Sequence, residues 1–483
     1  MIRVWCGFLT AALWLSILFI SSSALCAQQD DDLGLIPDNV LSQPPEEASE
    51  ALPETYRFKI YLDEAATMNI KRTDLAVPVP SLDDSDWNNR LSLDAKMEID
   101  LSSNLSFIMS DRLHYLLKEN QEESGGRVQN DLKELYVTGH SYHFLYLDIG
   151  RVNFKNGVAV GFNPTDYFKK NAVSYRISED PNLLRENRLG VVMARTQGIW
   201  EKGTVTLAFA PEMNQDQDKW WTDDGSYGLR LDKTNRSNRT LSKITLNAFP
   251  DFNPEFIYFY DSDRSHFGTN LTKGIGDSAI VYLEWSGSRR PDIFAQSLTE
   301  AQEAGIIPSS SLWAMDSGRE SHFQNQLAIG FSYTEKVNRT TFVEYHFNEA
   351  GFSQEDWDNW FNAGKEAKTL FQSPATEALG LGMLGQLWTT RKWSQEAQEP
   401  LSRHSIFIRT FWEDAFIHSL DLTGITRINL SDGSFFAQPM AEYHIKKNLT
   451  LSLCVNLFIG SDETEYGSVD PLGDVKAGAT YYF

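Results

Sequence analysis

Residues 151–195 concentrate basic side chains in a chain that is acidic as a whole. The segment holds eight basic residues against four acids, a local balance of +4, whereas the formal net charge of the chain is −23. Rings or ladders of cations make a pore selective for anions. The basic residues are Arg151, Lys155, Lys169, Lys170, Arg176, Arg185, Arg188 and Arg195, and the acids are Asp166, Glu179, Asp180 and Glu186. If the segment folds into a lumen, we expect a selective constriction set by Arg151, Lys169, Lys170, Arg176, Arg185 and Arg188.

The same segment allows two plainer interpretations. As an outward loop, its cations would bind lipopolysaccharide phosphates or pair with neighbouring acids, because charged side chains are mostly exposed to solvent. The stretch Asn163-Pro164-Thr165-Asp166 is also compatible with a simple turn, because Asn and Asp bond to their own backbone and Pro presets φ. The sequence leaves open whether residues 151–195 lie in a lumen or outside it.

Signals of catalysis and of metal binding are weak. The sequence contains no Gly-x-Ser-x-Gly elbow, no His-Glu-x-x-His helix and no phosphate-binding glycine loop. His140 and His143 are the only close pair among nine histidines, and their spacing does not place them reliably on one strand face, so we expect no metal site and no cofactor. The alternative function is a membrane-barrel hydrolase for lipid or peptide substrates. The Ser, His and acid groups of such an enzyme would not be revealed by their spacing in the sequence.

A second candidate binding segment contains Asp356 and Asp358 beside Trp357 and Trp360. An aromatic and acidic loop of this kind could bind a sugar or a divalent cation. The alternative is an interfacial tryptophan anchor with solvated acidic neighbours.

The elements that must position these residues are strands, because most of the chain alternates between apolar and polar residues. Tyr56, Phe58, Ile60 and Leu62 alternate with polar neighbours, and so do residues 91–99, 145–149, 205–209, 279–286, 327–333, 343–347 and 451–459. A strand places successive side chains on opposite faces, so each segment has one apolar and one polar face. We expect about 16–18 strands, many of them joined by short turns such as Ser102-Ser103-Asn104, Gly139-His140-Ser141 and Lys446-Lys447-Asn448.

Composition excludes several protein classes. Hydrophobic residues make up 41% of the chain, and no apolar run after the N-terminal segment is long enough for a membrane-spanning helix. The net charge opposes binding to nucleic acid. The 29 Phe, 18 Tyr and 13 Trp would fit the aromatic girdles of a membrane barrel, although an aromatic soluble β-protein is an alternative on composition alone.

The N-terminus predicts export. Arg3, an apolar core from Phe8 to Ile20 and the small residues before Ala27 form a signal peptide over residues 1–27. Cys26 allows a lipoprotein signal, although Leu25 is a poor match for it. Cleavage after Ala27 would leave Cys454 as the only thiol and exclude an internal disulfide. Residues 28–55 are acidic and lack periodicity, so we expect a periplasmic leader.

The C-terminal residues favour a membrane barrel over a soluble sandwich. Val475, Ala477, Ala479, Tyr481 and Phe483 alternate with more polar neighbours, and the chain stops at an aromatic residue. Such an ending resembles the strand by which bacterial outer-membrane proteins are recognised, here Tyr481-Tyr482-Phe483, so the barrel-assembly machinery is an expected partner. Closure follows physically, because a sheet in lipid cannot leave unpaired edge groups. We expect an all-β, transmembrane, antiparallel up-and-down barrel over residues 56–483 in a Gram-negative outer membrane, surrounded by lipid and lipopolysaccharide. Longer segments at 155–188, 287–322 and 349–376 should be irregular loops on one side.

Three stretches of the sequence resemble porin-like barrels of the alginate-export type and related proteobacterial barrels. They are Leu147 to Phe154, Gly161-Phe162-Asn163-Pro164-Thr165-Asp166-Tyr167-Phe168 and Arg185 to Gly190. The motif covers about a tenth of the chain. The resemblance implies a barrel of about 18 strands narrowed by infolded loops, with an electropositive constriction that passes an anionic polysaccharide. Only Arg151 stands on a matching motif position. The expected function is passive passage of a polar, anionic solute or polysaccharide, without catalysis.

Overall fold

The alternating segments of the sequence form strands in the computed structural model. It describes residues 56–483 apart from 73–74, 80–84, 119–126, 142–143, 174, 177, 214–228, 248–251, 263 and 317, so the predicted signal peptide and leader lie outside the described residues. The strands are β1 Tyr56–Ile70, β2 Trp87–Ser102, β3 Leu105–Lys118, β4 Arg127–Ser141, β5 Leu145–Val152, β6 Val191–Trp200, β7 Gly203–Ala210, β8 Arg239–Leu246, β9 Glu255–Asp261, β10 Arg264–Ile275, β11 Ala279–Arg290, β12 His322–Glu335, β13 Arg339–Asn348, β14 His404–Trp412, β15 Leu420–Asn429, β16 Phe435–Lys446, β17 Leu449–Ile459 and β18 Gly473–Tyr482.

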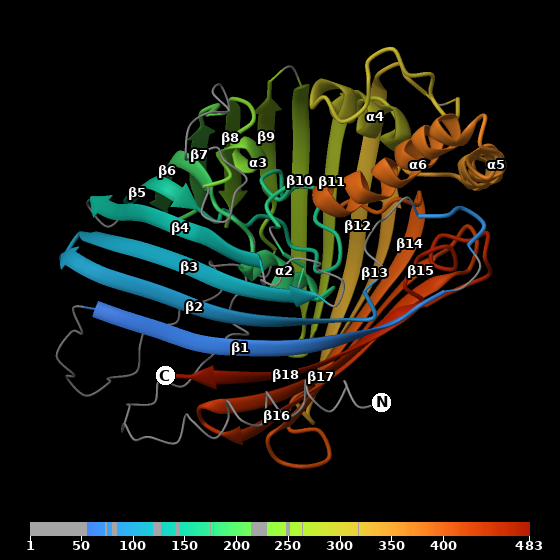
Figure 1. Ribbon diagram of the computed structural model, residues 1–483. Helices are drawn as coiled ribbons and strands as arrows, with labels where there is room; N and C mark the ends of the chain where they lie inside the picture. Colours follow the sequence, from blue (N-terminus) through green and yellow to red (C-terminus); the bar gives the residue numbers. More distant parts are fainter. Residues whose placement is uncertain are drawn as a thin grey trace. The chain divides into compact units, whose positions relative to one another are not determined.

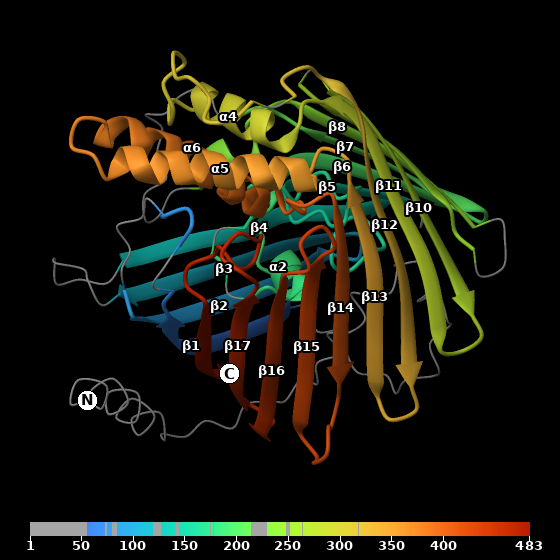
Figure 2. The same cartoon turned by 90° about the vertical axis from the view of Figure 1, so that its right-hand side faces the viewer.

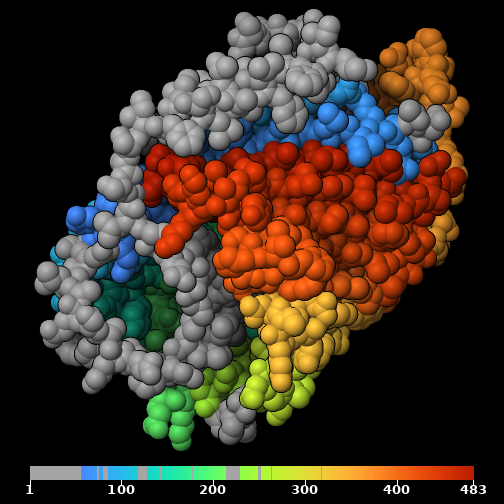
Figure 3. All heavy atoms as spheres, turned by 90° about the horizontal axis from the view of Figure 1, so that it is seen from below, coloured from blue at the N-terminus to red at the C-terminus, as the bar shows by residue number. Residues whose placement is uncertain are grey.

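These strands form one closed, 18-stranded antiparallel barrel (Figure 1). Each strand pairs with its neighbours in sequence, and β1 closes the ring by pairing with β18 from Tyr61 opposite Tyr482 to Ile70 opposite Gly473. Figure 3 shows this closure as the blue surface of β1 beside the red surface of the C-terminal strands. The predicted up-and-down barrel of 16–18 strands is confirmed, and no strand edge is left open in the ring.

The barrel is inside-out relative to a soluble protein. On β2, Ser92 and Asp94 point inward and are buried, whereas Leu91 and Leu93 point outward and are exposed. The same arrangement continues on β3, where Arg112 is buried and Leu113 is exposed. Apolar side chains on the outer surface are stable only in a hydrocarbon environment. The two-residue alternation therefore separates a lipid-facing surface from a polar interior.

The connections between strands are asymmetric. At one end of the barrel, short turns such as 103–104, 276–278, 336–338 and 447–448 join β2 to β3, β10 to β11, β12 to β13 and β16 to β17. At the other end lie the long segments 153–190, 291–321 and 349–403. Short turns face the periplasm and long loops face outward in outer-membrane barrels. One turn is displaced from its expected position, because β4 continues through Gly139-His140-Ser141.

All three of the long segments contain helices, contrary to the expectation of irregular loops. The helices are α2 Pro181–Glu186, α3 Leu231–Thr234, α4 Ile293–Glu303, α5 Gln354–Phe371 and α6 Glu377–Ala397. None of the helices in the described ranges is long and apolar enough to cross a membrane. Figures 1 and 2 show α4, α5 and α6 together at the long-loop end of the barrel. We call α4, α5 and α6 the helical cap.

The predicted aromatic and acidic loop is the start of α5. Asp356 accepts a hydrogen bond from the Ser353 backbone N–H at 2.8 Å, and Ser353 Oγ accepts one from the Asp356 N–H at 3.3 Å, which makes a capping box. Trp357 and Trp360 are fully buried in the core of the helical cap. Both the sugar-binding and the interfacial-anchor interpretations of these tryptophans are therefore wrong. The Ser353-to-Asp356 spacing was the sequence signal for a helix start.

Arg391 of α6 joins the helical cap to the connection between β17 and β18. Its guanidinium lies 5.2 Å from the ring centre of Trp357 and 4.7 Å from that of Trp360, close enough for cation–π attraction. It donates hydrogen bonds to Glu465 O at 2.9 Å and Ser468 Oγ at 2.6 Å. The cap is thereby fixed to a barrel connection remote in sequence.

Glu465 makes this junction dependent on pH. Burial raises the pKa of its carboxyl group to about 7. Between about pH 4.5 and pH 7 the folded protein therefore binds more protons than the unfolded chain, so the free energy of unfolding falls as the pH rises through this window, by about 3 kcal/mol. We expect this slope in urea unfolding in detergent followed by tryptophan fluorescence. Glu465→Gln should flatten it, and the same slope in that variant would contradict the assignment.

Candidate functional site

The connection between β5 and β6, residues 153–190, lies inside the barrel. We call it the crossing loop. Glu284 of β11, which is fully buried, accepts hydrogen bonds from the backbone N–H groups of Val158 at 2.9 Å, Ala159 at 3.0 Å and Thr165 at 2.7 Å. Thr165 Oγ1 donates a further one at 2.8 Å. A carboxylate in the wall thus satisfies the backbone of an irregular segment that would otherwise lack partners.

Glu344 of β13 holds the next part of the crossing loop in the same way. It accepts hydrogen bonds from Val160 N–H at 2.6 Å and Gly161 N–H at 2.9 Å. Tyr282 OH donates to it at 2.7 Å, and His346 Nε2 lies 2.7 Å from its second oxygen. Hydrogen bonds to a charged group are worth about 1.5–3 kcal/mol each. Together, Glu284 and Glu344 fix the loop to one wall of the barrel.

Two glycines allow this close approach. Gly157 has a φ of 96°, and a Cβ there would lie 2.7 Å from the Glu284 carboxylate oxygens. A Cβ at Gly161 would lie 2.4 Å from the ring of Phe407 on β14. Side chains at either position would therefore separate the loop from the wall.

Aromatic packing attaches the crossing loop to a second region of the wall. Tyr167 stacks on Phe259 of β9 with ring centres 4.6 Å apart, and Phe168 meets the same ring edge-on. Phe154, Phe168 and Phe259 belong to one buried cluster with inward residues of β6, β7, β8 and β9. Here the barrel interior is apolar, because the loop rather than water covers it.

The loop also reaches the opposite side of the barrel. The ring of Tyr175 lies 5.5 Å from His114 of β3 and 5.8 Å from the guanidinium of Arg90 on β2. In the ring of 18 strands, β2 and β11 are nine positions apart, which places them on opposite walls. Asp180 of the loop pairs with Arg409 of β14 at 3.2 Å. The crossing loop therefore spans the lumen from wall to wall.

Three of the six predicted selectivity residues are neutralised by carboxylates. Lys170 Nζ lies 2.6 Å from Glu300 of α4, Arg176 Nη1 lies 2.6 Å from Glu179, and Arg188 Nη1 lies 2.6 Å from Asp166. Arg176 and Arg188 also donate to Gln395 O and Gln398 Oε1 at the end of α6, at 2.9 and 2.7 Å. These three residues join the crossing loop to the helical cap.

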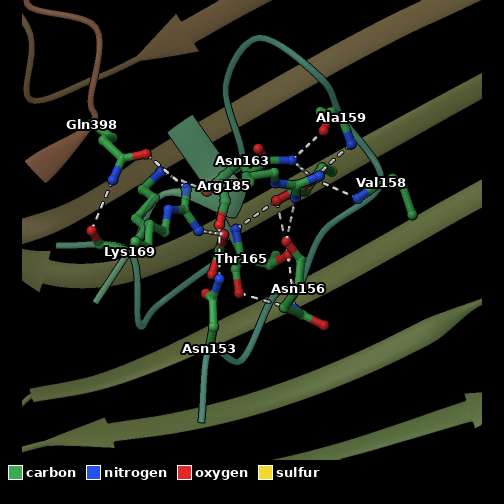
Figure 4. Close-up of polar contacts among 12 residues, drawn as sticks. Asn153, Asn156, Val158, Ala159, Asn163, Thr165, Lys169, Arg185 and Gln398 are labelled. Carbon is green, nitrogen blue, oxygen red and sulfur yellow. Dashed lines mark hydrogen bonds and ion pairs between the residues drawn. The ribbon is translucent and has the colours of Figure 1, made fainter. Parts of the chain in front are cut away.

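The other three donate to backbone carbonyls. Arg151 donates to Gly190 O and Leu229 O at 3.0 and 2.8 Å. Lys169 donates to Asn163 O at 2.6 Å, and burial lowers its pKa to about 8. Arg185 donates to Asn156 O at 2.7 Å, and Figure 4 shows both residues. Its side chain is only partly buried.

The position of the segment settles one of the alternatives left open by the sequence. Residues 153–190 lie in the lumen rather than outside the barrel. Three of the six predicted selectivity residues nevertheless pair with acids, which the interpretation as an outward loop had expected of the basic residues. Whether the six residues select anions stays a prediction.

A network on β1–β4 was not predicted from the sequence. Asp94 pairs with Arg112 and, at 2.5 Å, with Lys133, and Asp131 lies 3.1 Å from His114 Nε2. The polar residues that alternate with Leu91 and Leu93 indicated a polar inner face. The sequence did not show the network, because the partners of these residues lie on other strands. These paired charges line the interior without a large excess of either sign.

Ser92, His114 and Asp131 resemble a hydrolase triad only in composition. Ser92 Oγ bonds to His114 Nδ1 at 2.9 Å and Asp131 to Nε2 at 3.1 Å, whereas a serine hydrolase uses Nε2 for the serine and Nδ1 for the acid. Ser92 is also 1% exposed and accepts a hydrogen bond from Arg90. The arrangement is a structural network of the wall.

No group of metal-ligating residues occurs among the residues that the structure describes. His140 of β4 lies with its ring centre 5.9 Å from that of Tyr146, and His143 falls outside the described residues. Cys454 is a buried free thiol on β17. The described part of the chain therefore offers a lumen and a crossing loop as the candidate site.

Comparison with known proteins shows the fold. No protein-family model and no curated protein matches the chain. The structure of Acinetobacter baumannii OccAB1 matches with a TM-score of 0.50 at 8% identity, covering 90% of this chain and 98% of that chain. Pseudomonas aeruginosa OccK11 (OpdR) gives 0.46 at 9% identity, covering 89% and 96%, and a triple mutant of the Rhodopseudomonas blastica porin gives 0.37 at 10%, covering 89% and 100%. By its likeness to OccAB1, the chain has the porin-like barrel fold of Gram-negative outer-membrane proteins.

Proposed function

We propose that this protein is a channel of the Gram-negative outer membrane through which a small polar solute passes passively. The observation that carries the proposal is the closed, inside-out barrel whose lumen is crossed by one fixed loop. An outer surface of apolar side chains requires a bilayer around it, and the polar side chains of the interior are stable when water fills the lumen. The hydrolase alternative gains no support, because the Ser92 network has the wrong geometry.

The crossing loop favours a small solute over a polysaccharide. It contacts β2 and β3 through Tyr175 and β11 and β13 through Glu284 and Glu344. A polymer needs a continuous wide bore, and contacts on opposite walls divide the lumen. Polysaccharide passage, as the resemblance to alginate-export-type barrels implies, stays a prediction.

Selectivity for anions would depend chiefly on Arg185. Unlike Lys170, Arg176 and Arg188, it has carbonyl rather than carboxylate oxygen as its hydrogen-bond partner, and it is only partly buried. Its charge is therefore not cancelled by a direct ion pair. Arg151 and Lys169 share the carbonyl partners but are buried.

The test is conductance of the purified full-length protein in a planar bilayer. We expect stepwise currents, and Arg185→Glu should shift the reversal potential in a salt gradient toward cation preference, since it reverses a charge on the loop that crosses the lumen. Lys447→Glu, which makes the same change in the short β16–β17 turn, is the control and should not shift it. Equal shifts in both variants would remove Arg185 from the selectivity site, and no conductance at all would overturn the channel.

The expected partners follow from the same proposal. Lipid and lipopolysaccharide would surround the barrel, and the barrel-assembly machinery would recognise the strand that ends at Tyr481-Tyr482-Phe483. Deletion of Phe483 should lower the amount of heat-modifiable barrel in outer-membrane fractions.

A further inference from the structure

The outer face of β10–β14 carries a hollow of about 750 Å³. Figure 2 shows these five strands side by side. We call the hollow the outer groove. Its described walls are almost entirely apolar, and among the described lining residues Lys273 is the one that carries a charge. The lining residues include Leu271, Val281, Leu283, Ile329, Phe331, Val343, Tyr345 and Ile406.

The groove follows two neighbouring rows of outward side chains across the sheet. In one row, Lys273 lies opposite Val281, which lies opposite Phe331 and then Val343. In the other, Leu271, Leu283, Ile329, Tyr345 and Ile406 are opposite one another in turn. The hollow is therefore elongated and crosses the strands, as an extended hydrocarbon chain would require.

Lys273 stands at the end of the groove nearest the short turns. It lies three residues before the 276–278 turn, whereas Ile406 at the other end lies seven residues before Glu413, where the next short connection begins. Short turns mark the periplasmic boundary of such a barrel, where lipid headgroups lie. Lys273 is exposed and has no ion pair or hydrogen bond from its ammonium group within the described ranges. A cation at the headgroup end of an apolar groove is complementary to an anionic lipid.

We propose that the outer groove binds an anionic glycerophospholipid, with one acyl chain along the two rows and the phosphate at Lys273. Hydrocarbon surrounds this face, so an acyl chain needs no desolvation of polar groups to enter it. The ammonium group of Lys273 favours an anionic headgroup, and the apolar groove retains the acyl chain. The proposal concerns the outer surface and does not depend on what passes through the lumen.

The test counts bound lipids by native mass spectrometry of the full-length protein in mild detergent, with phosphatidylglycerol and phosphatidylethanolamine as probes. Wild type should retain one phosphatidylglycerol in preference to phosphatidylethanolamine. Lys273→Gln should weaken phosphatidylglycerol binding about fivefold and leave phosphatidylethanolamine unchanged. Val281→Trp should fill the groove and abolish retention of both lipids.

Matched controls separate the groove from the general lipid surface. Lys447→Gln removes a cation from another short turn, and Leu453→Trp adds the same large ring to the outward face of β17. Both should bind phosphatidylglycerol as wild type does. Equal retention of the two lipids by wild type, or equal losses in the controls, would overturn the proposal.

Discussion

The Glu284→Ala/Glu344→Ala variant is expected to show a single-channel conductance severalfold higher than wild type, with larger current noise. The two carboxylates accept the backbone hydrogen bonds that fix the crossing loop to β11 and β13. Without them, the N–H groups of the loop can form hydrogen bonds only if the loop leaves the wall and exposes them to water. Each N–H group that stays buried and unpaired costs about 1–3 kcal/mol. A loop that moves would widen the passage and make it fluctuate.

Graded variants test the mechanism. Glu284→Gln keeps the size of the side chain but replaces one acceptor oxygen by a donor, so its conductance should lie between those of wild type and the alanine variant. Glu98→Ala is the control, because Glu98 points inward from β2 and pairs with Arg57 rather than with the loop. Unchanged conductance in the double variant would show that the crossing loop does not limit flow.

The buried pair of Asp166 and Arg188 should show the second large effect. Asp166 is fully buried and Arg188 is 3% exposed. Removing one partner of such a pair leaves an uncompensated buried charge, at a cost of about 3–5 kcal/mol. We expect Asp166→Ala to open the crossing loop and to accelerate hydrogen exchange of its 163–189 backbone by about a hundredfold to several thousandfold. Mass spectrometry of peptides from the exchanged protein measures this directly.

A double replacement separates the pair from its individual members. Asp166→Leu/Arg188→Met removes both charges and keeps apolar volume, so its exchange should be closer to wild type than that of Asp166→Ala. Arg339→Ala, which removes a partly exposed ion pair with Glu335, should change exchange of the loop little. If Asp166→Ala and the double variant exchange equally fast, the charge pair is not what holds the loop.

The crossing loop and the helical cap form one connected structure. Arg188 bonds to Asp166 within the loop and to Gln398 after α6, and Gln398 Nε2 donates to Lys169 O at 2.9 Å. Lys170 reaches Glu300 of α4. A basic segment that the sequence presents as a charge cluster is therefore, in large part, a set of connectors between the lumen and the outer end of the barrel.

The amino-acid sequence by itself determined the barrel. A two-residue period depends only on neighbours in the chain, so Leu91, Ser92 and Leu93 are enough to show which faces are apolar and polar. The long connections were located, but their helices were missed. The Ser353-to-Asp356 spacing was a local signal for the start of α5, but most of the stability of α5 and α6 comes from tertiary packing around Trp357 and Trp360. Tertiary structure alone decided the crossing loop. Glu284 and Glu344 meet backbone N–H groups more than a hundred residues away, and such a contact depends on where the closed barrel places its opposite wall, which no local pattern encodes.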